Sequence, residues 1–247
     1  ATDAGFLERG WFADDFSLPG QALLHVLRSP HPHARIAWID AKAAAAMPGV
    51  VAILTGEDLV RAGVKPFVSS ADFRRADGSP TAAPPHRALA VGTVRYVGEA
   101  VVAVVAETMH QARDAAEAVV LDIDPLPAVT LASEAAKAGA PQLFDDVPGN
   151  VALDYHYGDG EKVAAAIAGA AHVTRLSLRN TRLIVAAMEP RAALAEYDPA
   201  SGRFTLHAQS QGVFGMKNQL ADILGVKPDK VRILTGNVGG SFGMKAP

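Results

Sequence analysis

The chain has 247 residues, enough for one large domain or for two ordinary domains with hydrophobic cores. Its formal net charge of -3 gives no global basic field, so nucleic acid and anionic membrane surfaces are poor candidate partners. The sequence lacks cysteine, which excludes disulfides, thiolate catalysis, cysteine-based zinc sites and iron–sulfur ligation by this polypeptide. No apolar run approaches the roughly 20 residues that cross a bilayer, and the acidic N-terminus differs from a signal peptide. We therefore expect a cytoplasmic protein and leave a periplasmic location open.

Strand and helix patterns alternate at the start of the chain. Apolar runs predict three strands, the third of them buried, and two helices, at residues 22–27, 35–39 and 50–54 and at residues 42–47 and 56–62. Thr55 and Asp58 can cap the second helix. Residues 65–85 lack periodicity and predict a long surface loop, in which Arg74 and Arg75 form a solvated pair.

The next segment contains the most apolar strand pattern of the chain. A nearly unbroken β-branched run at residues 99–106 is typical of a strand that is covered on both faces. Alanine and charge at helical spacing predict a helix at 108–119, and an apolar run predicts a strand at 120–123. Together these three elements predict a β-α-β unit. Residues 133–150 then read as a connection between two domains, since they contain a short alanine-rich helix followed by proline and glycine.

The second half ends in a strand and a glycine-rich loop. We predict a helix at about 161–168, long strands at 172–178 and 184–197, and an edge or half-buried strand at 203–207. A helix at 213–224 would present Phe214, Leu220 and Ile223 on one face and end at Gly225. The last strand, at 231–235, leads directly into the loop.

The stretch from Gly236 to Lys245 is the part most difficult to explain as scaffold. It places glycines at 236, 239, 240 and 243, which allow left-handed conformations and let backbone amides approach a ligand. A structural turn is an equally open interpretation. A Walker A loop would need Ser or Thr directly after Lys245, and a dinucleotide fingerprint would need glycine at Val238, so ATP and NAD are disfavoured as ligands.

Two upstream stretches contain further candidate binding groups. Gln209-Ser-Gln-Gly212 places two amides and a glycine between a strand and a helix N-terminus, where donors can converge on one ligand, although a capped turn is an open alternative. Met188-Glu-Pro-Arg191 interrupts a predicted strand. Glu189 has the chemistry of an acid or base, but the sequence favours a solvated or arginine-paired carboxylate.

Taken together, the motifs resemble the molybdopterin-binding large subunit of the xanthine dehydrogenase and aldehyde oxidase family. The second half carries the resemblance in Met188-Glu-Pro-Arg191, Glu196-Tyr-Asp-Pro-Ala-Ser-Gly-Arg203, Gln209-Ser-Gln-Gly212 and Val238-Gly-Gly-Ser-Phe-Gly-Met-Lys245. The first half carries it in Arg28-Ser-Pro-His-Pro-His-Ala-Arg-Ile36, Met47-Pro-Gly-Val-Val-Ala-Ile-Leu-Thr-Gly56 and Tyr96-Val-Gly-Glu-Ala100. These motifs cover essentially the whole chain in the family's order.

The resemblance implies an α+β fold in which an a/b hammerhead domain is followed by the beginning of a mixed α/β molybdopterin-binding domain. The implied division is an N-terminal extension, the hammerhead domain, a linker and an incomplete cofactor-binding domain, at residues 1–18, 19–132, 133–150 and 151–247. The implied reaction is hydroxylation of an aldehyde or an N-heterocycle with water as the oxygen source. The implied partners are the remainder of the molybdenum subunit and subunits or domains that carry iron–sulfur clusters and FAD.

The resemblance also implies which residues bind the cofactor. Gln211 corresponds to the glutamine whose side chain approaches the molybdenum, with Gly212 beside it. The loop that passes beside the metal centre corresponds to Gly239, Gly240, Ser241, Phe242 and Gly243. No residue of this chain is expected to ligate the metal directly. A molybdenum cofactor brings its own ligands, so a protein without cysteine can hold it through orientation and hydrogen bonds.

Three departures limit what the resemblance implies. Ser241 stands where many members have glycine. Ala246 stands where purine-hydroxylating members carry a substrate-binding glutamate, so the resemblance does not indicate xanthine as substrate. The family's general-base glutamate is expected beyond Pro247, so we expect no catalytic residue in this chain and no activity from it alone. The alternative is a non-catalytic module that serves assembly with partner subunits.

Overall fold

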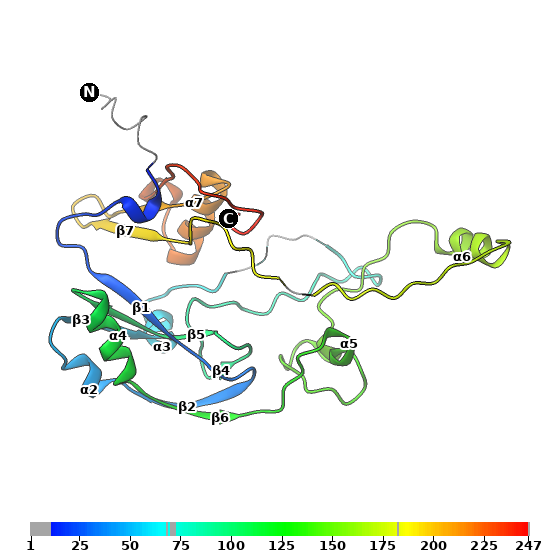
Figure 1. The fold of residues 1–247 in the computed structure, drawn as a ribbon, viewed down its shortest axis with the longest axis horizontal. Helices are drawn as coiled ribbons and strands as arrows, with labels where there is room; N and C mark the ends of the chain where they lie inside the picture. Colours follow the sequence, from blue (N-terminus) through cyan, green and yellow to red (C-terminus); the bar gives the residue numbers. More distant parts are fainter. Residues whose placement is uncertain (1–10, 68, 70–72, 182, 247) are drawn as a thin grey trace.

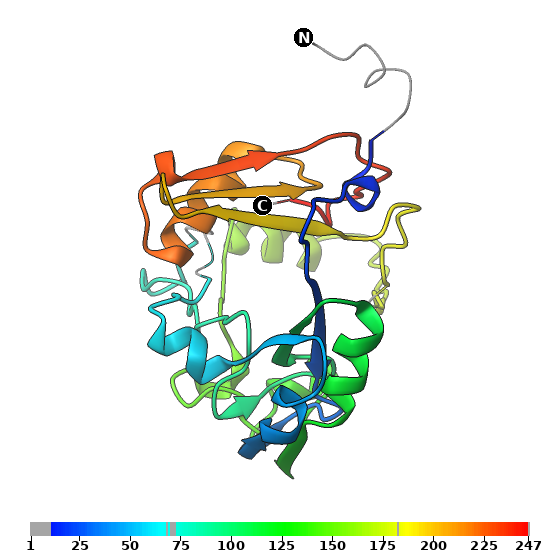
Figure 2. The ribbon, with the colours of Figure 1, turned by 90° about the vertical axis from the view of Figure 1, so that its left-hand side faces the viewer.

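A computed structural model describes residues 11–67, 69, 73–181 and 183–246, so part of the predicted extension 1–18 lies outside the described residues. Residues 23–125 form a first body and residues 193–246 a second body, which lie one above the other (Figures 1 and 2). Residues 151–188 form an arm that reaches away from both bodies (Figure 1). The mixture of helices with small, mainly antiparallel sheets confirms the predicted α+β class.

The first body contains two three-stranded sheets with the strand orders β1-β5-β3 and β4-β2-β6. All of their strand pairs are antiparallel. Its strands are β1 Leu23–Arg28, β2 Ala34–Asp40, β3 Val50–Thr55, β4 Thr93–Val94, β5 Ala100–Ala106 and β6 Val120–Pro125. Its helices are α2 Lys42–Ala45, α3 Gly56–Arg61 and α4 Met109–Glu117. Each predicted strand and helix of this region is present, although several ends differ by a few residues.

The core of the first body lies around the central strand β5. Val101, Val102 and Val104 are fully buried, as the β-branched run predicted. Helix α4 packs against β1 and β5 through a face of small residues that includes Ala112 and Ala115. Small side chains let the helix approach the sheet closely.

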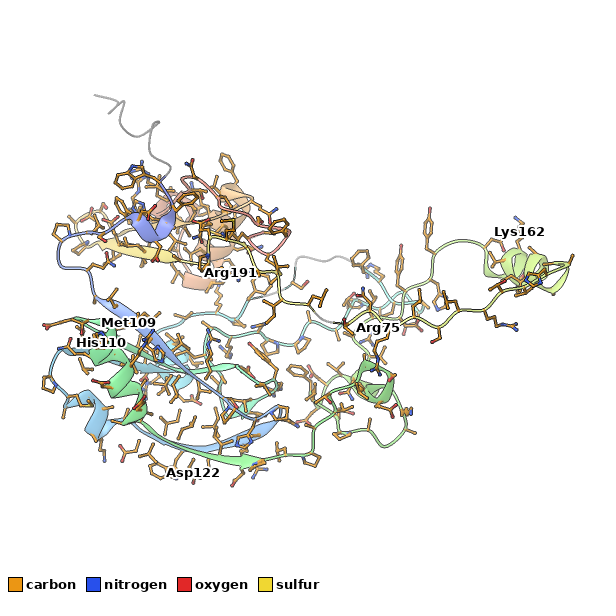
Figure 3. All side chains as sticks on the ribbon, viewed as in Figure 1. Arg75, Met109, His110, Asp122, Lys162 and Arg191 are labelled. Carbon is orange, nitrogen blue, oxygen red and sulfur yellow. The ribbon has the colours of Figure 1, made fainter. Side chains whose placement is uncertain are left out.

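Two predictions for this body are wrong. Strand β3 is not buried, because it lies at the edge of its sheet and Val51 points outward with 61% of its surface exposed. The strands β5 and β6 do not complete a β-α-β unit, because β6 pairs with β2 in the other sheet. Helix α4 therefore connects two sheets, and β6 forms the lower edge of the body, where Figure 3 labels Asp122.

The loop at residues 65–85 holds the base of the arm. The N–H of Ala82 donates to the carbonyl oxygen of Ala152, and the Arg75 guanidinium donates to the carbonyl oxygens of Val151 and Ala152. Phe73 packs edge-on against Tyr155 with 5.6 Å between ring centroids. Arg75 (labelled in Figure 3) thus binds the backbone of the arm and is not the solvated residue that we predicted.

Among its described residues, the arm contains one regular element. Helix α6 Gly160–Ala168 was predicted and is exposed on all sides, with Lys162 at the far end of the molecule (Figure 3). The predicted strand 172–178 is extended but forms no ladder with another described segment, and the predicted strand 184–197 is paired only from Ala193 onward. These two predictions are wrong because a strand needs a hydrogen-bonded partner as well as an extended sequence pattern. The connection before the arm contains α5 Ala132–Ala135 and the short 3-10 helix η2 Pro148–Asn150.

The second body is a three-stranded sheet with one long helix. Its elements are β7 Ala193–Asp198, β8 Arg203–Ala208, α7 Val213–Leu224, the 3-10 helix η3 Pro228–Lys230 and β9 Val231–Leu234. Strand β8 is the central strand, antiparallel to β7 and parallel to β9, so it is half-buried without being an edge strand. Gly225 ends α7 in a left-handed conformation with φ +67°, as predicted. Phe214 is exposed, so it does not share a buried face with Leu220 and Ile223.

The N-terminal segment lies against the second body and not against the first. The 3-10 helix η1 Ala13–Asp15 lies beside the C-terminal loop in both views (Figures 1 and 2). The carbonyl oxygen of Trp11 accepts a hydrogen bond from the N–H of Asn237 at 2.9 Å. Among the described residues, no helix is both long enough and apolar enough to span a membrane.

Candidate functional site

The glycine loop, residues 235–246, follows the end of β9 and contains residues with unusual backbone. Gly240 and Gly243 have φ angles of +96° and +84°, which L side chains rarely adopt. Phe242 has φ +50° although it is not glycine, and 75% of its surface is exposed. A large apolar side chain held outward on a left-handed backbone is uncommon and is a feature of functional loops.

Two other glycines of the loop are required for packing. A Cβ on Gly236 would lie 2.6 Å from the carbonyl oxygen of Trp11, and a Cβ on Gly239 would lie 2.6 Å from the Cβ of Glu189. Glycine therefore lets the N-terminal segment and the Glu189 backbone contact the loop directly. A Cβ on Gly243, in contrast, would meet nothing within 4 Å among the described residues. The loop is thus packed on one side and open on the other.

Glu189 lies at the centre of the packed side, with 8% of its surface exposed. Its Oε2 accepts from the N–H of Gly239 at 2.7 Å and from Lys245 Nζ at 2.9 Å. Its Oε1 accepts from Gln209 Nε2 at 2.9 Å and from the N–H of Ala13 at 3.4 Å. Lys245, which is 5% exposed, donates a second bond to the carbonyl oxygen of Glu189 at 3.0 Å. One carboxylate therefore joins four separate parts of the chain.

The same contacts determine the protonation state of Glu189. Burial by itself raises the pKa of the carboxyl group, but the donors from Lys245, Gly239, Gln209 and Ala13 outweigh it and lower the pKa from 4.5 to about 2. The group is therefore ionised at neutral pH. Our prediction of a solvated or arginine-paired carboxylate is wrong, because the partner is Lys245 and the pair is buried.

The second predicted stretch contacts the end of the loop. The N–H of Gln211 donates to the carbonyl oxygen of Lys245 at 2.9 Å, and Gly212 is the residue that precedes α7. Gln211 is exposed, and its side-chain amide has no hydrogen-bond partner among the described residues. Gln209 does not converge on the same space, since its amide bonds Glu189, Ala192 and Pro190. Only one of the two predicted amides is therefore available to a ligand.

The structure thus brings the seven sequence-predicted residues onto two adjacent segments. Gln211 and Gly212 lie beside one end of the glycine loop, and the other five residues form its turn. No hydrogen bond joins the Gln211 side chain to Phe242 among the described residues. Sequence reasoning missed Lys245 as a structural partner and Gln209 as part of the network. Only the apolar setting of Glu189 could have indicated a buried acid, and nothing local indicated its partner, which is 56 positions away.

The open side of the loop has unused hydrogen-bonding capacity. Among the described residues, the amides of Gly240, Ser241, Phe242 and Gly243 bond no other residue. The Ser241 hydroxyl oxygen is buried and has no partner among them either. A cavity of about 330 Å³ begins at the neighbouring Met244 and is lined by Arg191, Met216 and Ala246 among others, although residues 240–243 do not line it. These donors fit a group that needs hydrogen bonds and close backbone approach.

The donors also indicate what kind of group fits. In the part of the chain that the structure describes, no three His, Asp or Glu side chains cluster in a way that could hold a metal ion. The side chain and backbone groups at this position are amides, one hydroxyl and an aromatic ring. Such a set suits a cofactor that carries its own metal ligands and takes orientation from the protein.

Two family models match the chain. One is described as the a/b hammerhead domain of aldehyde oxidase and xanthine dehydrogenase and matches residues 9–127. The other is described as a molybdopterin cofactor-binding domain and matches residues 143–247. The chain belongs to the aldehyde oxidase and xanthine dehydrogenase family. Within this family match, the glycine loop, Gln211 and Glu189 all fall in the cofactor-binding part, and the first body falls in the hammerhead part. The domain bounds that we derived from the sequence stay predictions.

Family members with known activities match nearly all of this chain. The carbon monoxide dehydrogenase large chain of Hydrogenophaga pseudoflava is 32% identical, over 98% of this chain and 30% of that protein. The nicotine 6-hydroxylase large subunit of Paenarthrobacter nicotinovorans is 33% identical, over 96% of this chain and 28% of that protein. The solved structure of quinoline 2-oxidoreductase from Pseudomonas putida 86 superposes with a TM-score of 0.84 at 30% identity, over 97% of this chain and 29% of that one. The chain therefore spans less than a third of the length of these family members.

Proposed function

We propose that this chain forms one wall of the molybdenum cofactor pocket of a molybdenum hydroxylase, which oxidises an aldehyde or an N-heterocycle with water as the oxygen source. The observation that supports it is the combination of a firmly held loop with free donors on its open side. The free Gln211 amide lies beside that loop. The names of the nicotine 6-hydroxylase and quinoline 2-oxidoreductase relatives favour an N-heterocycle among the candidate substrates.

In this proposal the residues of the chain bind and orient. Gln211 offers a side-chain amide to the cofactor, and the backbone amides of residues 240–243 offer hydrogen bonds at a distance that only glycine-rich backbone permits. The Phe242 ring forms an apolar wall against which a flat substrate can lie. When bound, the cofactor supplies the redox chemistry, in which a substrate C–H bond becomes C–OH with oxygen from water while protons and an electron pair leave.

The electron pair needs acceptors outside this chain, because a polypeptide without cysteine ligates no iron–sulfur cluster through thiolates. We propose iron–sulfur clusters and FAD on partner subunits or domains as those acceptors. The general-base glutamate would come from sequence beyond Pro247, in the remainder of the molybdenum subunit. We propose a cytoplasmic location for the assembly.

Isotope labelling tests the proposed reaction. The native complex that contains this chain is purified and supplied with aldehydes and N-heterocycles in water enriched in ¹⁸O. We expect a hydroxylated product that carries ¹⁸O, because water is the oxygen source. A product whose oxygen comes from O₂ would contradict the proposal. We expect no preference for xanthine, since Ala246 cannot supply a carboxylate to a purine.

The exposed arm favours one alternative, a non-catalytic module for assembly with partner subunits. Leu178 and Ile184 expose 81% and 94% of their surfaces, which suits contact with another polypeptide more than contact with water. Co-purification separates the two functions. Molybdenum and pterin in the complex support the hydroxylase, whereas a stable metal-free complex with intact partners supports the assembly module.

A further inference from the structure

The buried pair of Glu189 and Lys245 connects two separate points of the glycine loop. Oε2 of the single Glu189 carboxylate accepts from the Gly239 amide at 2.7 Å and from the Lys245 ammonium at 2.9 Å. These two donors lie on either side of residues 240–244, which form the turn of the glycine loop. The carboxylate therefore closes residues 239–245 into a ring, although the two ends are separated by five residues along the chain.

The ring is linked directly to the other predicted cofactor contact. The carbonyl oxygen of Lys245 accepts a hydrogen bond from the backbone N–H of Gln211, with 2.9 Å between nitrogen and oxygen. The position of Lys245 therefore constrains the backbone of Gln211. Gln209, two residues earlier, donates to Oε1 of the same carboxylate at 2.9 Å. A shift of Glu189 would therefore move both segments of the proposed pocket together.

The backbone of the loop needs such a constraint. Phe242 has φ +50°, a conformation that costs a non-glycine residue free energy and persists only where surrounding contacts enforce it. The Phe242 N–H donates to no other described residue, and 75% of the surface of this residue is exposed. Within the loop, the Met244 N–H donates to the Ser241 carbonyl oxygen at 2.9 Å, a bond that spans Phe242. The contacts of Glu189 with Gly239 and Lys245 hold this turn on its two sides.

We propose that Glu189 and Lys245 are positioning residues, which fix the glycine loop and Gln211 in the conformation that receives the cofactor. The pair acts through the loop and touches neither cofactor nor substrate. This inference rests on the proposed function for the identity of the ligand, but the effect on the loop is independent of it.

Hydrogen exchange in the native complex tests the positioning role. The informative amides are those that the pair holds directly or through the loop, namely Gly239, Gln211 and Met244, and the β9 amides serve as internal reference. In K245M we expect exchange at these three amides to be about tenfold faster or more, since a hydrogen bond to a charged group contributes at least that factor. Exchange in β9 should not change.

A second variant and a control separate positioning from stability. The double variant E189Q/K245M removes both buried charges together, so it should be more stable than either single variant. We still expect fast exchange at Gly239, because the end of the loop remains detached. The control K65M makes the same change in the exposed pair of Lys65 and Asp222, whose N–O distance is 3.0 Å, and should leave the three amides unchanged.

Cofactor content gives a readout that distinguishes this inference from the proposed function. We expect K245M and E189Q/K245M complexes to lose molybdenum and pterin relative to the K65M complex. If the unaltered complex contains no molybdenum, the proposed function fails, and the exchange measurement alone decides the positioning role. Unchanged exchange at the three amides, or acceleration that is equal throughout the second body, would overturn the inference.

Discussion

At the scale of single residues, the glycine loop shows that glycines in one motif can serve different purposes. Gly239 is needed because the Glu189 side chain lies where its Cβ would be, at 2.6 Å. Gly243 has no such neighbour, and its left-handed backbone with φ +84° faces open space. We interpret that space as the side from which the cofactor approaches, so a methyl group at 243 should interfere with binding more than with folding.

The variant Gly243→Ala tests this interpretation against Gly202→Ala. Both glycines have positive φ, and a Cβ on either one would meet no described atom within 4 Å, but Gly202 lies in the turn between β7 and β8. Each variant should lose about 1–2 kcal/mol of stability from backbone strain. Only Gly243→Ala should lower the molybdenum and pterin content of the complex. Equal cofactor content in both variants would contradict the account.

The ionisation of Glu189 predicts how stability depends on pH. Its pKa is 4.5 when unperturbed and about 2 in the folded chain, where Lys245 is the charged group that faces it. The stabilisation is therefore fully present above about pH 4.5 and is lost as the pH falls toward 2. Thermal unfolding followed from neutral pH downward should show a steeper loss below pH 4.5 in the unaltered chain than in Glu189→Gln.

The unaltered chain must be compared with Glu189→Gln because other carboxyl groups with lowered pKa values also make the folded chain less stable at low pH. The Thr55 hydroxyl lowers the pKa of Asp58, and the Ser201 hydroxyl lowers the pKa of Asp198. Both are unchanged in Glu189→Gln, so the difference between the two curves isolates Glu189. Parallel curves would show that its carboxylate does not stabilise the folded chain through ionisation.

How much of the site could be predicted depended on distance along the chain. Gln211, Gly212 and the loop could be proposed because their motifs are local and resemble those of the family, and their role as cofactor contacts stays a prediction. The Glu189–Lys245 pair could not, because it joins positions 56 residues apart and its energetics depend on burial, which single residues do not indicate. Gln209 and Gln211 illustrate the limit, since the Gln209 side chain bonds Glu189 whereas the exposed Gln211 side chain bonds no described residue.

At the scale of elements, the strands that were predicted correctly are those that pair with another described strand. The β-branched run of β5 indicates burial on both faces, and β1 and β3 pair with it on its two sides. Residues 172–178 have a similar extended pattern, but no described segment pairs with them. Sequence alone indicated extension in both cases and could not indicate pairing.

The position of a strand in its sheet should determine the cost of removing its side chains. Val104 in β5 is fully buried, whereas Val51 in the edge strand β3 is 61% exposed. Val104→Ala should lower the free energy of unfolding by about 2 kcal/mol, because it leaves a cavity among fixed neighbours. Val51→Ala should change it by no more than about 0.5 kcal/mol. Equal losses in chemical denaturation would contradict the assignment of β5 as the core strand.

At the scale of the whole molecule, the first body and the arm differ in how much apolar side-chain surface they bury. The first body has a buried core, and loop residue Lys65 joins it to α7 through a hydrogen bond to the Ile223 carbonyl oxygen and an ion pair with Asp222. The arm has helix α6 and long extended segments with exposed apolar side chains. We infer that the arm contacts other polypeptide in the assembled protein.

The variant Leu178→Arg tests the contact role of the arm. The side chain is 81% exposed, so the change should leave the thermal stability of the isolated chain nearly unaltered, within about 0.5 kcal/mol. Recovery of partner polypeptides with the tagged chain should fall several-fold, because a charge would be buried in the contact. Val97→Arg places the same charge at an exposed position of the first body and should have a smaller effect. Equal recovery from both variants would contradict a contact role for the arm.

The measurement that tests the central claim most directly is the molybdenum and pterin content of the native complex purified through this chain. The claim is that Gln211 and the glycine loop form one wall of a cofactor pocket. We therefore predict molybdenum and pterin in amounts equimolar with the chain, and a clear reduction in the Gly243→Ala complex. An intact complex that contains neither molybdenum nor pterin would contradict it.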